Sequence, residues 1–131
     1  MAETRKGRTG RGRQKAFPQR GEIYLTALDP ALGHEIKKTR PALVIQNDVS
    51  NQYSSTTIVA AITSKVSSPS YPNEVVIQPG QSGLTMTSTV RLDQIRTVDR
   101  QRLLTCLGRV DASVMQKVDE AIKISLGLIA L

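Results

Sequence analysis

Aromatic residues and cysteine are scarce in this chain of 131 residues. It contains no tryptophan, aromatic residues make up 3%, and Cys106 is the single cysteine. One cysteine cannot form a disulfide within the chain, which fits a reducing cytoplasm, with a disulfide-free secreted protein as the alternative. Because hydrophobic residues still reach 39%, the core is expected to be aliphatic.

Side chains that serve several common chemistries are missing as well. His34 is the only histidine, which excludes a pair of histidines within one chain as an acid–base system. One cysteine and one histidine are too few for a Cys/His zinc site, and the carboxylates show no clustered ligand spacing. No glycine-rich phosphate loop is followed by Lys and Ser or Thr. The sequence therefore predicts no metal ion and no cofactor.

Long apolar segments are also missing. No run approaches the roughly 20 apolar residues that a membrane-spanning helix needs. The N-terminus is basic, but no apolar signal-peptide core follows it. We therefore expect a cytoplasmic protein without a membrane partner.

Positive charge is abundant but confined to one end of the chain. The formal net charge is +7, and residues 1–20 carry seven cations against one anion, so they account for +6 of it. Residues 1–18 are rich in Gly and Arg and poor in apolar residues, which predicts a disordered basic arm. The arm either keeps the protein in solution or attracts RNA electrostatically. Residues 19–131 are predicted to form one folded domain.

The body of the chain has the pattern of a mainly β protein with a C-terminal helix. Short apolar or alternating segments are separated by Gly, Pro and polar connections, which is typical of strands and loops. From Asp111, the predicted N-cap, apolar residues recur at helical spacing as far as Ile129. These features predict a small, partly open antiparallel barrel packed by one helix. The predicted strands are 21–28, 41–46, 57–63, 74–78, 88–98 and 106–110.

Two polar residues stand at the ends of apolar strands. Arg40 precedes the strand 41–46 and is followed by Pro41, which biases the arginine towards extended geometry. Thr63 ends the strand 57–63. Taken alone, an arginine before a strand is usually a solvated edge charge, and a threonine in a strand is usually there for its β propensity.

Several sequence blocks in order resemble the MazF/PemK family of toxin endoribonucleases from type II toxin–antitoxin systems. The resemblance extends from about Gln19 to Leu128 and leaves out the basic arm. It rests on RGEIYLTALDP, GHEIKKTRPALVIQND, TIVAAITSK, GLTMTSTVRLDQIRTVDRQRL and VDEAIKISLGL. It implies an SH3-like barrel, a homodimer, and sequence-specific, metal-independent cleavage of single-stranded RNA (an mRNA interferase acting in stress responses). It also implies inhibition by a cognate antitoxin, and an active site at Arg40 and Thr63.

The chemistry of these two residues is compatible with that role. RNA is cleaved when its 2′-OH attacks the adjacent phosphate, which leaves a 2′,3′-cyclic phosphate and a 5′-OH. The planar guanidinium of Arg40 suits phosphate oxygens, and the hydroxyl of Thr63 offers another donor for the charge that develops. Arginine is a poor general base because its ordinary pKa lies near 12.5 or above. Which groups act as general base and general acid stays open.

Six further residues are candidates for RNA binding, and each has a plain structural alternative. Four lie in the polar loop before the second strand, where an exposed histidine is more often inert than catalytic. Two lie in the long strand 88–98, where a polar side chain bonded to backbone, or arginines paired on the surface, are the rival interpretations. The six are His34, Glu35, Lys37, Lys38, Arg91 and Gln94.

Two other functions fit the same general pattern. Gyrase-poisoning toxins share this fold, but they act through a C-terminal Trp–Gly–Ile end, whereas this chain ends GLIAL and has no tryptophan. A non-catalytic barrel that binds RNA or protein is the other alternative. Cleavage of labelled RNA, as opposed to binding without cleavage, separates such a barrel from an endoribonuclease.

Overall fold

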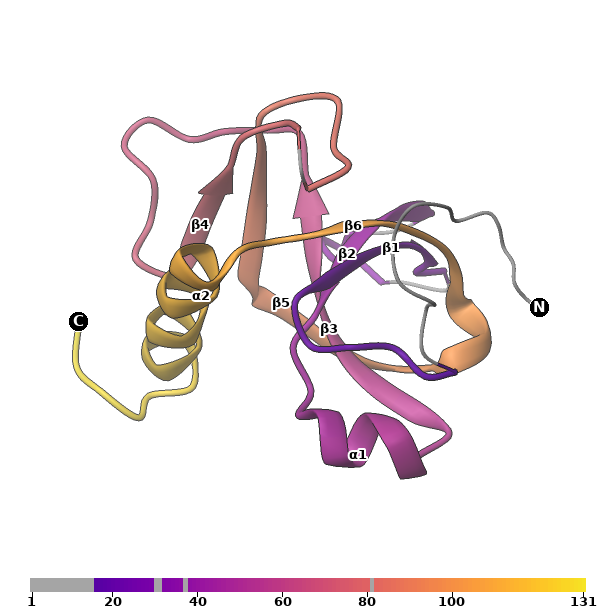
Figure 1. Cartoon of the computed structure of the whole chain (residues 1–131). Helices are drawn as coiled ribbons and strands as arrows, with labels where there is room; N and C mark the ends of the chain where they lie inside the picture. The colour runs from indigo at the N-terminus through magenta and orange to yellow at the C-terminus, as the bar shows by residue number, and fades with distance from the viewer. Residues whose placement is uncertain (1–15, 30–31, 37, 81) are drawn as a thin grey trace.

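A computed structural model describes residues 16–29, 32–36, 38–80 and 82–131 (Figure 1). Nearly all of the predicted basic arm, residues 1–18, lies outside these ranges. The described chain forms six strands, two α-helices and one 3-10 turn. In chain order they are β1 (Glu22–Ala27), β2 (Thr39–Val44), α1 (Asp48–Tyr53), β3 (Thr56–Thr63), β4 (Glu74–Ile77), β5 (Ser88–Asp99), η1 (Arg100–Arg102), β6 (Leu103–Arg109) and α2 (Ala112–Ser125).

All six strands belong to one antiparallel sheet in the order β4-β5-β3-β2-β1-β6. Every predicted strand is present, with ends shifted by up to three residues. Within the described residues the edge strands β4 and β6 share no hydrogen-bonded ladder. The prediction of a mainly β, partly open antiparallel barrel with a C-terminal helix is confirmed.

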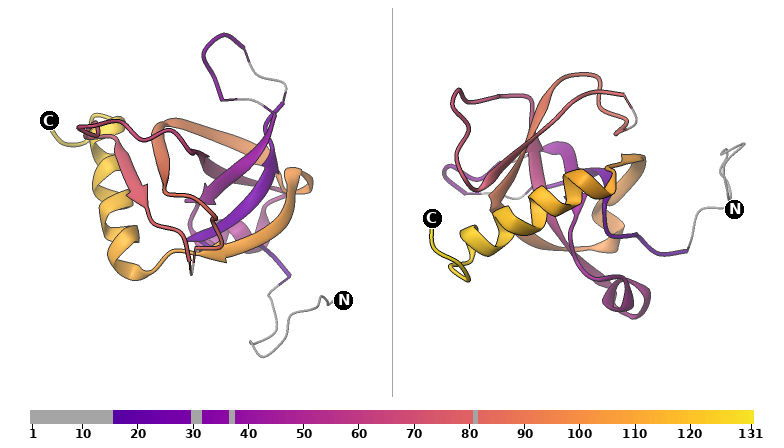
Figure 2. Two further views of the ribbon diagram at one scale, coloured as in Figure 1. Left: turned by 90° about the horizontal axis from the view of Figure 1, so that it is seen from above. Right: turned by 60° about the vertical axis from the view of Figure 1, so that its left-hand side comes forward.

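The sheet curls because its ladders contain irregularities. On β3, Ala60 is paired with Ile95 of β5, and the next residue, Ala61, is paired with Arg91. The extra residues on β5 form a bulge, which increases the local twist and bends the strand. The ladder between β1 and β6 also shifts register twice. The view from above in Figure 2 shows the resulting curvature.

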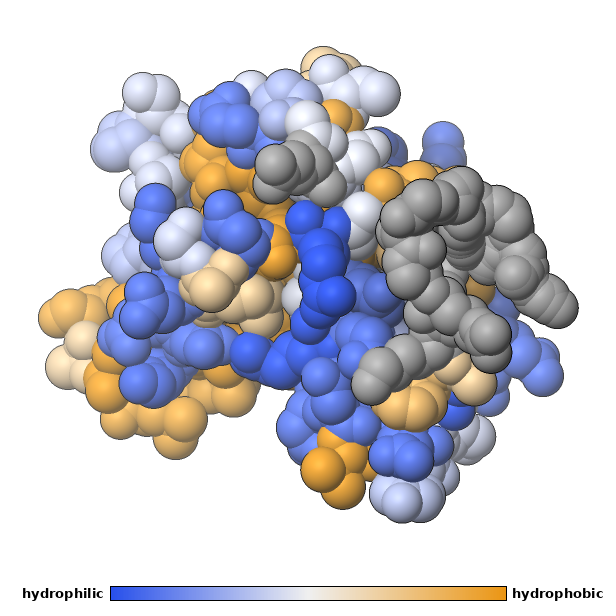
Figure 3. All heavy atoms as spheres, in the orientation of Figure 1, coloured by the Kyte–Doolittle hydropathy of each residue, from blue (hydrophilic) through white to orange (hydrophobic). Residues whose placement is uncertain are grey.

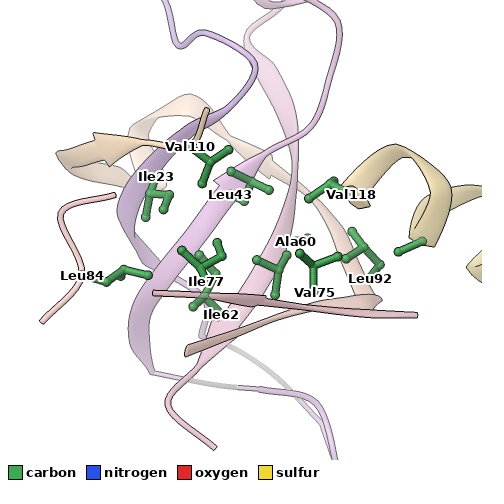
Figure 4. Close-up of a cluster of buried hydrophobic side chains, with 12 residues drawn as sticks. Ile23, Leu43, Ala60, Ile62, Val75, Ile77, Leu84, Leu92, Val110 and Val118 are labelled. Atoms are coloured by element: carbon green, nitrogen blue, oxygen red, sulfur yellow. The ribbon is translucent and has the colours of Figure 1, made fainter. Parts of the chain in front are cut away.

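Alternating side chains of the strands form two apolar clusters on opposite faces of the sheet. Leu43 and Ile62 belong to the larger cluster, which Val118 of α2 covers (Figure 4). Ala121 of α2 belongs to the same cluster. The smaller cluster contains Ala42, Val44, Val59 and Val98, with Tyr24 and Leu103 packed against it. As the composition predicts, the larger cluster is aliphatic.

The C-terminal helix begins as predicted and ends earlier than predicted. Asp111 is its N-cap, and the carboxylate accepts a hydrogen bond of 2.9 Å from the backbone N–H of Val114. The helix stops at Ser125 because Gly127, at φ +74°, adopts a left-handed backbone that terminates it. Ile129 therefore lies beyond the helix, and the chain end forms an exposed apolar patch (Figure 3).

The segment 47–56, expected to be a polar connection, contains the short helix α1. Asn47 caps it by accepting a hydrogen bond of 2.8 Å from the N–H of Ser50. Asn51 is fully buried, and its side chain binds the backbone oxygen of Gln46 and the hydroxyl of Thr57. This polar network anchors the helix against β3.

Candidate active site

Arg40 and Thr63 lie at the same end of the neighbouring strands β2 and β3. Ala42 is paired with Ala61, and two positions further along this register Arg40 stands opposite Thr63. Both residues line one pocket of about 150 Å³. Its other lining residues are Pro41, Ile62, Ser64, Leu84, Thr85, Met86 and Ser88.

Arg40 lies inside β2 rather than ahead of it, which corrects the predicted strand start. The ladder with β1 extends to the pairs Thr26–Arg40 and Ala27–Thr39. Pro41 does not interrupt this ladder. The backbone oxygen of Val44 accepts a hydrogen bond from the N–H of Gly21, beside β1, and the backbone polar groups of successive residues point to opposite sides of a strand. Those of Pro41, three residues before Val44, therefore face β3. Proline lacks an N–H, and the β2–β3 ladder starts only at Ala42. The pocket opens where this ladder ends.

The polar groups of Arg40 and Thr63 are placed to meet a ligand. Arg40 is exposed, and within the described residues its guanidinium has no hydrogen bond or ion pair. The hydroxyl oxygen of Thr63 accepts a hydrogen bond of 3.2 Å from the N–H of Lys65. That bond leaves the hydroxyl hydrogen of Thr63 available to donate. The pocket therefore offers a cation and a hydroxyl donor side by side.

None of the other predicted RNA-binding residues that the structure describes lines this pocket. His34 and Glu35 are exposed in the loop between β1 and β2, and the Glu35 carboxylate accepts from the N–H of Leu32. Lys38 is exposed, has φ +70°, and its N–H donates to Asp29 at 2.7 Å. Lys37 lies outside the described residues.

The two candidates in β5 are engaged with other groups. The Gln94 side-chain oxygen accepts from the N–H of Ile36 at 3.3 Å, so it contacts the same loop. Arg91 forms a bidentate pair with Asp93, at 2.8 and 2.6 Å, and lies 3.6 Å from Glu74. The hydrogen bond from Arg91 lowers the pKa of Asp93 below its usual value. A guanidinium held in this way is less available for phosphate than that of Arg40.

Two more arginines hold the base of the loop between β1 and β2. Arg96 donates to the backbone oxygen of Leu28, and Arg102 donates to those of Ala27, at 3.0 Å, and Asp29. Both cations thus support the segment that leads towards Arg40.

Comparison with known proteins identifies relatives of this chain. The profile of the family described as "PemK-like, MazF-like toxin of type II toxin-antitoxin system" matches residues 19–126. Endoribonuclease EndoA of Bacillus subtilis (strain 168) is 45% identical over 111 residues, which cover 85% of this chain and 96% of that protein. The chain belongs to the PemK/MazF-like toxin family.

Solved structures of MazF-type toxins have the same fold. MazF from Deinococcus radiodurans superposes with a TM-score of 0.73 at 28% identity, covering 86% of this chain and 99% of that one. A mycobacterial endoribonuclease, solved in complex with its cognate antitoxin, superposes with a TM-score of 0.72 at 25% identity. That match covers 87% of this chain and 99% of that one. The family predicted from the sequence blocks is confirmed.

Two walls of the pocket of this PemK/MazF-like toxin are the ends of β2 and β3. The pocket also has a third wall, which was not predicted from the sequence. Leu84, Thr85 and Met86 come from the connection between β4 and β5, and Ser88 opens β5. The only signal in the sequence was the hydroxyl-rich stretch TMTST, residues 85–89. Nearby, the buried hydroxyl of Thr89 has no hydrogen-bond partner among the described residues.

Two further properties concern only the part of the chain that the structure describes. No three His, Cys, Asp or Glu side chains in it gather closely enough to hold a metal ion. No helix in it is long and apolar enough to cross a membrane.

Proposed function

We propose that this toxin is a sequence-specific endoribonuclease that cleaves single-stranded RNA, including mRNA, in the cytoplasm. The observation that carries the proposal is the shared pocket of Arg40 and Thr63 at the end of the β2–β3 ladder. Family membership and the name of the 45%-identical relative, Endoribonuclease EndoA, support the same reaction class.

The reaction proceeds by attack of a ribose 2′-OH on the adjacent phosphorus. The 2′-oxygen–phosphorus bond forms as the 2′ proton leaves to a base, and the phosphorus–5′-oxygen bond breaks as the 5′-oxygen receives a proton. The products are a 2′,3′-cyclic phosphate and a 5′-OH. No atom of the protein becomes bonded to the substrate, and the reaction has no need of a metal ion.

Arg40 and Thr63 stabilise the charge that develops on the phosphate during this attack. The guanidinium places two N–H groups on the phosphate oxygens, and the Thr63 hydroxyl donates a third hydrogen bond. The sheet fixes the backbone positions from which both donors extend, so they start close to the developing charge. Donors that are already near this charge need less reorganisation at the moment of reaction, which makes this form of stabilisation effective. Arg40 acts as an electrostatic group rather than as the general base, because its ordinary pKa is near 12.5.

The toxin works as a homodimer and is held inactive by a cognate antitoxin. Such a partner lays an acidic, largely disordered segment across the face that contains Arg40, so that its carboxylates occupy the place of RNA phosphates. The mycobacterial relative that was solved in complex with its cognate antitoxin supports this form of control.

Mapping of RNA ends tests the proposed function. Purified protein is incubated with a long single-stranded RNA, with and without EDTA, and both ends at each cut are identified. We expect cuts at one short sequence, cyclic phosphate ends, and the same rate in EDTA. Binding without cleavage would instead support a non-catalytic RNA-binding barrel, and loss of activity in EDTA would contradict the metal-independent reaction.

A further inference from the structure

The connection between β4 and β5 has its own internal hydrogen bonds. The Ser82 hydroxyl donates to the backbone oxygen of Gln78 at 3.1 Å and accepts from the N–H of Leu84 at 3.3 Å. Gly83 donates to the backbone oxygen of Gly80 at 2.9 Å. These bonds link Gln78, Gly80 and Leu84 in one hydrogen-bonded unit.

Gly83 joins this unit to the opposite edge of the sheet. A Cβ atom added to Gly83 would lie 1.8 Å from the backbone oxygen of Leu107 and 2.4 Å from its carbonyl carbon. Leu107 belongs to β6, while the connection starts from β4, and these are the two edge strands. Figures 1 and 2 show the connection passing beside β6. The backbone contact at Gly83 therefore brings together the two edges that no ladder joins.

The residues directly after Gly83 form the third wall of the pocket. Leu84 is buried in the larger apolar cluster, whereas Thr85 and Met86 are exposed, Met86 to 58%. The wall is thus anchored on its inner side and presents a hydroxyl and an apolar side chain on its outer side. A nucleotide has matching chemistry, because its phosphate suits Arg40 and the flat face of its base suits a thioether side chain.

We propose that Gly83 is a positioning residue whose contact with β6 holds the wall Leu84–Met86, and that Thr85 and Met86 help to select the nucleotide beside the scissile phosphate. The proposal rests on the function proposed above and adds a determinant of sequence choice to it. Only glycine suits this position, since any side chain would overlap the β6 backbone and the φ of +81° disfavours other residues.

Gly83→Ala tests the contact, and Gly80→Ala is its matched control. Both glycines lie in the same connection with positive φ, +81° and +115°, but a Cβ on Gly80 meets nothing within 4 Å. Both variants therefore place an alanine in a backbone conformation that disfavours it, and only Gly83→Ala displaces the wall from β6. Thermal melting, kcat, KM and the distribution of cuts on a mixed-sequence RNA are measured for both, well below their melting temperatures.

We expect Gly83→Ala to raise KM, to change the distribution of cuts, and to lower kcat/KM by on the order of a hundredfold, as a shift of about 1 Å in a positioning group does. Gly80→Ala should keep the wild-type KM and cut sites. A purely structural role would lower the folded fraction, and hence the apparent kcat, with KM and cut sites unchanged. That result, or equal changes of KM and cut sites in the two variants, would overturn the proposal.

If Gly83→Ala does not fold, Met86→Ala and Thr85→Ala test whether the wall helps to select the nucleotide. Both side chains are exposed, so melting temperatures should stay near the wild-type value. We expect Met86→Ala to change the preferred cut site and to lower kcat/KM by about tenfold, the usual effect of losing an apolar contact to a substrate. Unchanged KM and cut sites in both variants would overturn the proposal.

The same variants distinguish failure of the wall from failure of the proposed reaction. If the wild-type protein binds RNA selectively without cutting it, the endoribonuclease proposal fails. The role of the wall is then decided by the affinities of the variants for a panel of RNA oligonucleotides that differ at one base. Wild-type protein that neither cuts nor binds any of these RNAs would overturn both proposals.

Discussion

Replacing Arg40 with alanine removes the guanidinium from the pocket that it shares with Thr63. Loss of one preorganised charged donor typically lowers kcat by about a hundred- to a thousandfold. Because Arg40 is exposed, water screens its charge, so we expect the lower end of this range, on the order of 3 kcal/mol in the barrier. Arg40→Lys keeps the charge without the planar pair of donors, so its kcat should lie between those of the wild type and Arg40→Ala.

Folding should be nearly unaffected by the same substitution. Arg40 has no hydrogen-bond partner among the described residues, and exposed substitutions of this kind change the free energy of unfolding by about 0.5 kcal/mol or less. Cleavage of a labelled RNA and thermal melting are measured together. Arg109→Ala, which removes another exposed cation outside the pocket lining, controls for the loss of net charge. Full cleavage by Arg40→Ala at an unchanged melting temperature would refute the role given to Arg40.

Further predictions concern the second pocket residue, the buried polar groups and the basic arm. Thr63→Val should reduce cleavage clearly but less than Arg40→Ala, and Thr63→Ser should restore it, as measured with the same RNA. Burial raises the pKa of Glu22 above its ordinary value of 4.5. The folded state therefore binds the carboxyl proton of Glu22 more tightly than the unfolded state does. The free energy of unfolding falls as pH rises through the interval between the unfolded and folded pKa values. Glu22→Gln should accordingly raise the melting temperature near pH ~7 and lose this gain near pH ~4. Asn51→Ala should lower the free energy of unfolding by about 1–3 kcal/mol in urea titrations, because it removes the hydrogen bonds between Asn51 and Gln46 and takes away the buried acceptor of the Thr57 hydroxyl. Deleting residues 1–15 should weaken RNA binding at low salt only and leave the cut sites unchanged.

Any of four results would contradict these expectations. They are wild-type cleavage by Thr63→Val, a pH-independent effect of Glu22→Gln, an unchanged urea midpoint for Asn51→Ala, and new cut sites in the truncated protein. The truncation stops before Ala16 because its backbone oxygen accepts a hydrogen bond of 2.9 Å from Arg100.

Local pattern was sufficient to predict most of the fold. Alternation and apolar runs located every strand, and Asp111 marked the start of α2, because these signals depend on residues close together in the chain. The predictions were wrong for the segment that forms α1, where the pattern is short, and for the end of α2, where a glycine interrupts the apolar spacing. The helix α1 has six residues, too few for a helical period to be visible. Ile129 continued the apolar spacing of α2, but Gly127 had already ended that helix.

The site was predictable only in part. The residues themselves did not distinguish Arg40 from a solvated edge charge, and the resemblance to a toxin family singled it out together with Thr63. The structure adds that the two residues meet because β2 and β3 are antiparallel neighbours. The third wall depends on a contact between Gly83 and Leu107, which are far apart in the chain. A tertiary contact of this kind leaves no periodic signal in the sequence.

Cleavage of an RNA that carries one 2′-deoxy nucleotide tests the central claim most directly. The substitution is placed on the nucleotide whose 2′-OH would attack at the mapped cut site, in an RNA that contains a second, unmodified copy of the same sequence. The proposed reaction predicts no cleavage at the modified site and normal cleavage at the unmodified one. Cleavage of both sites at the same rate would contradict attack by the 2′-OH and the roles assigned to Arg40 and Thr63.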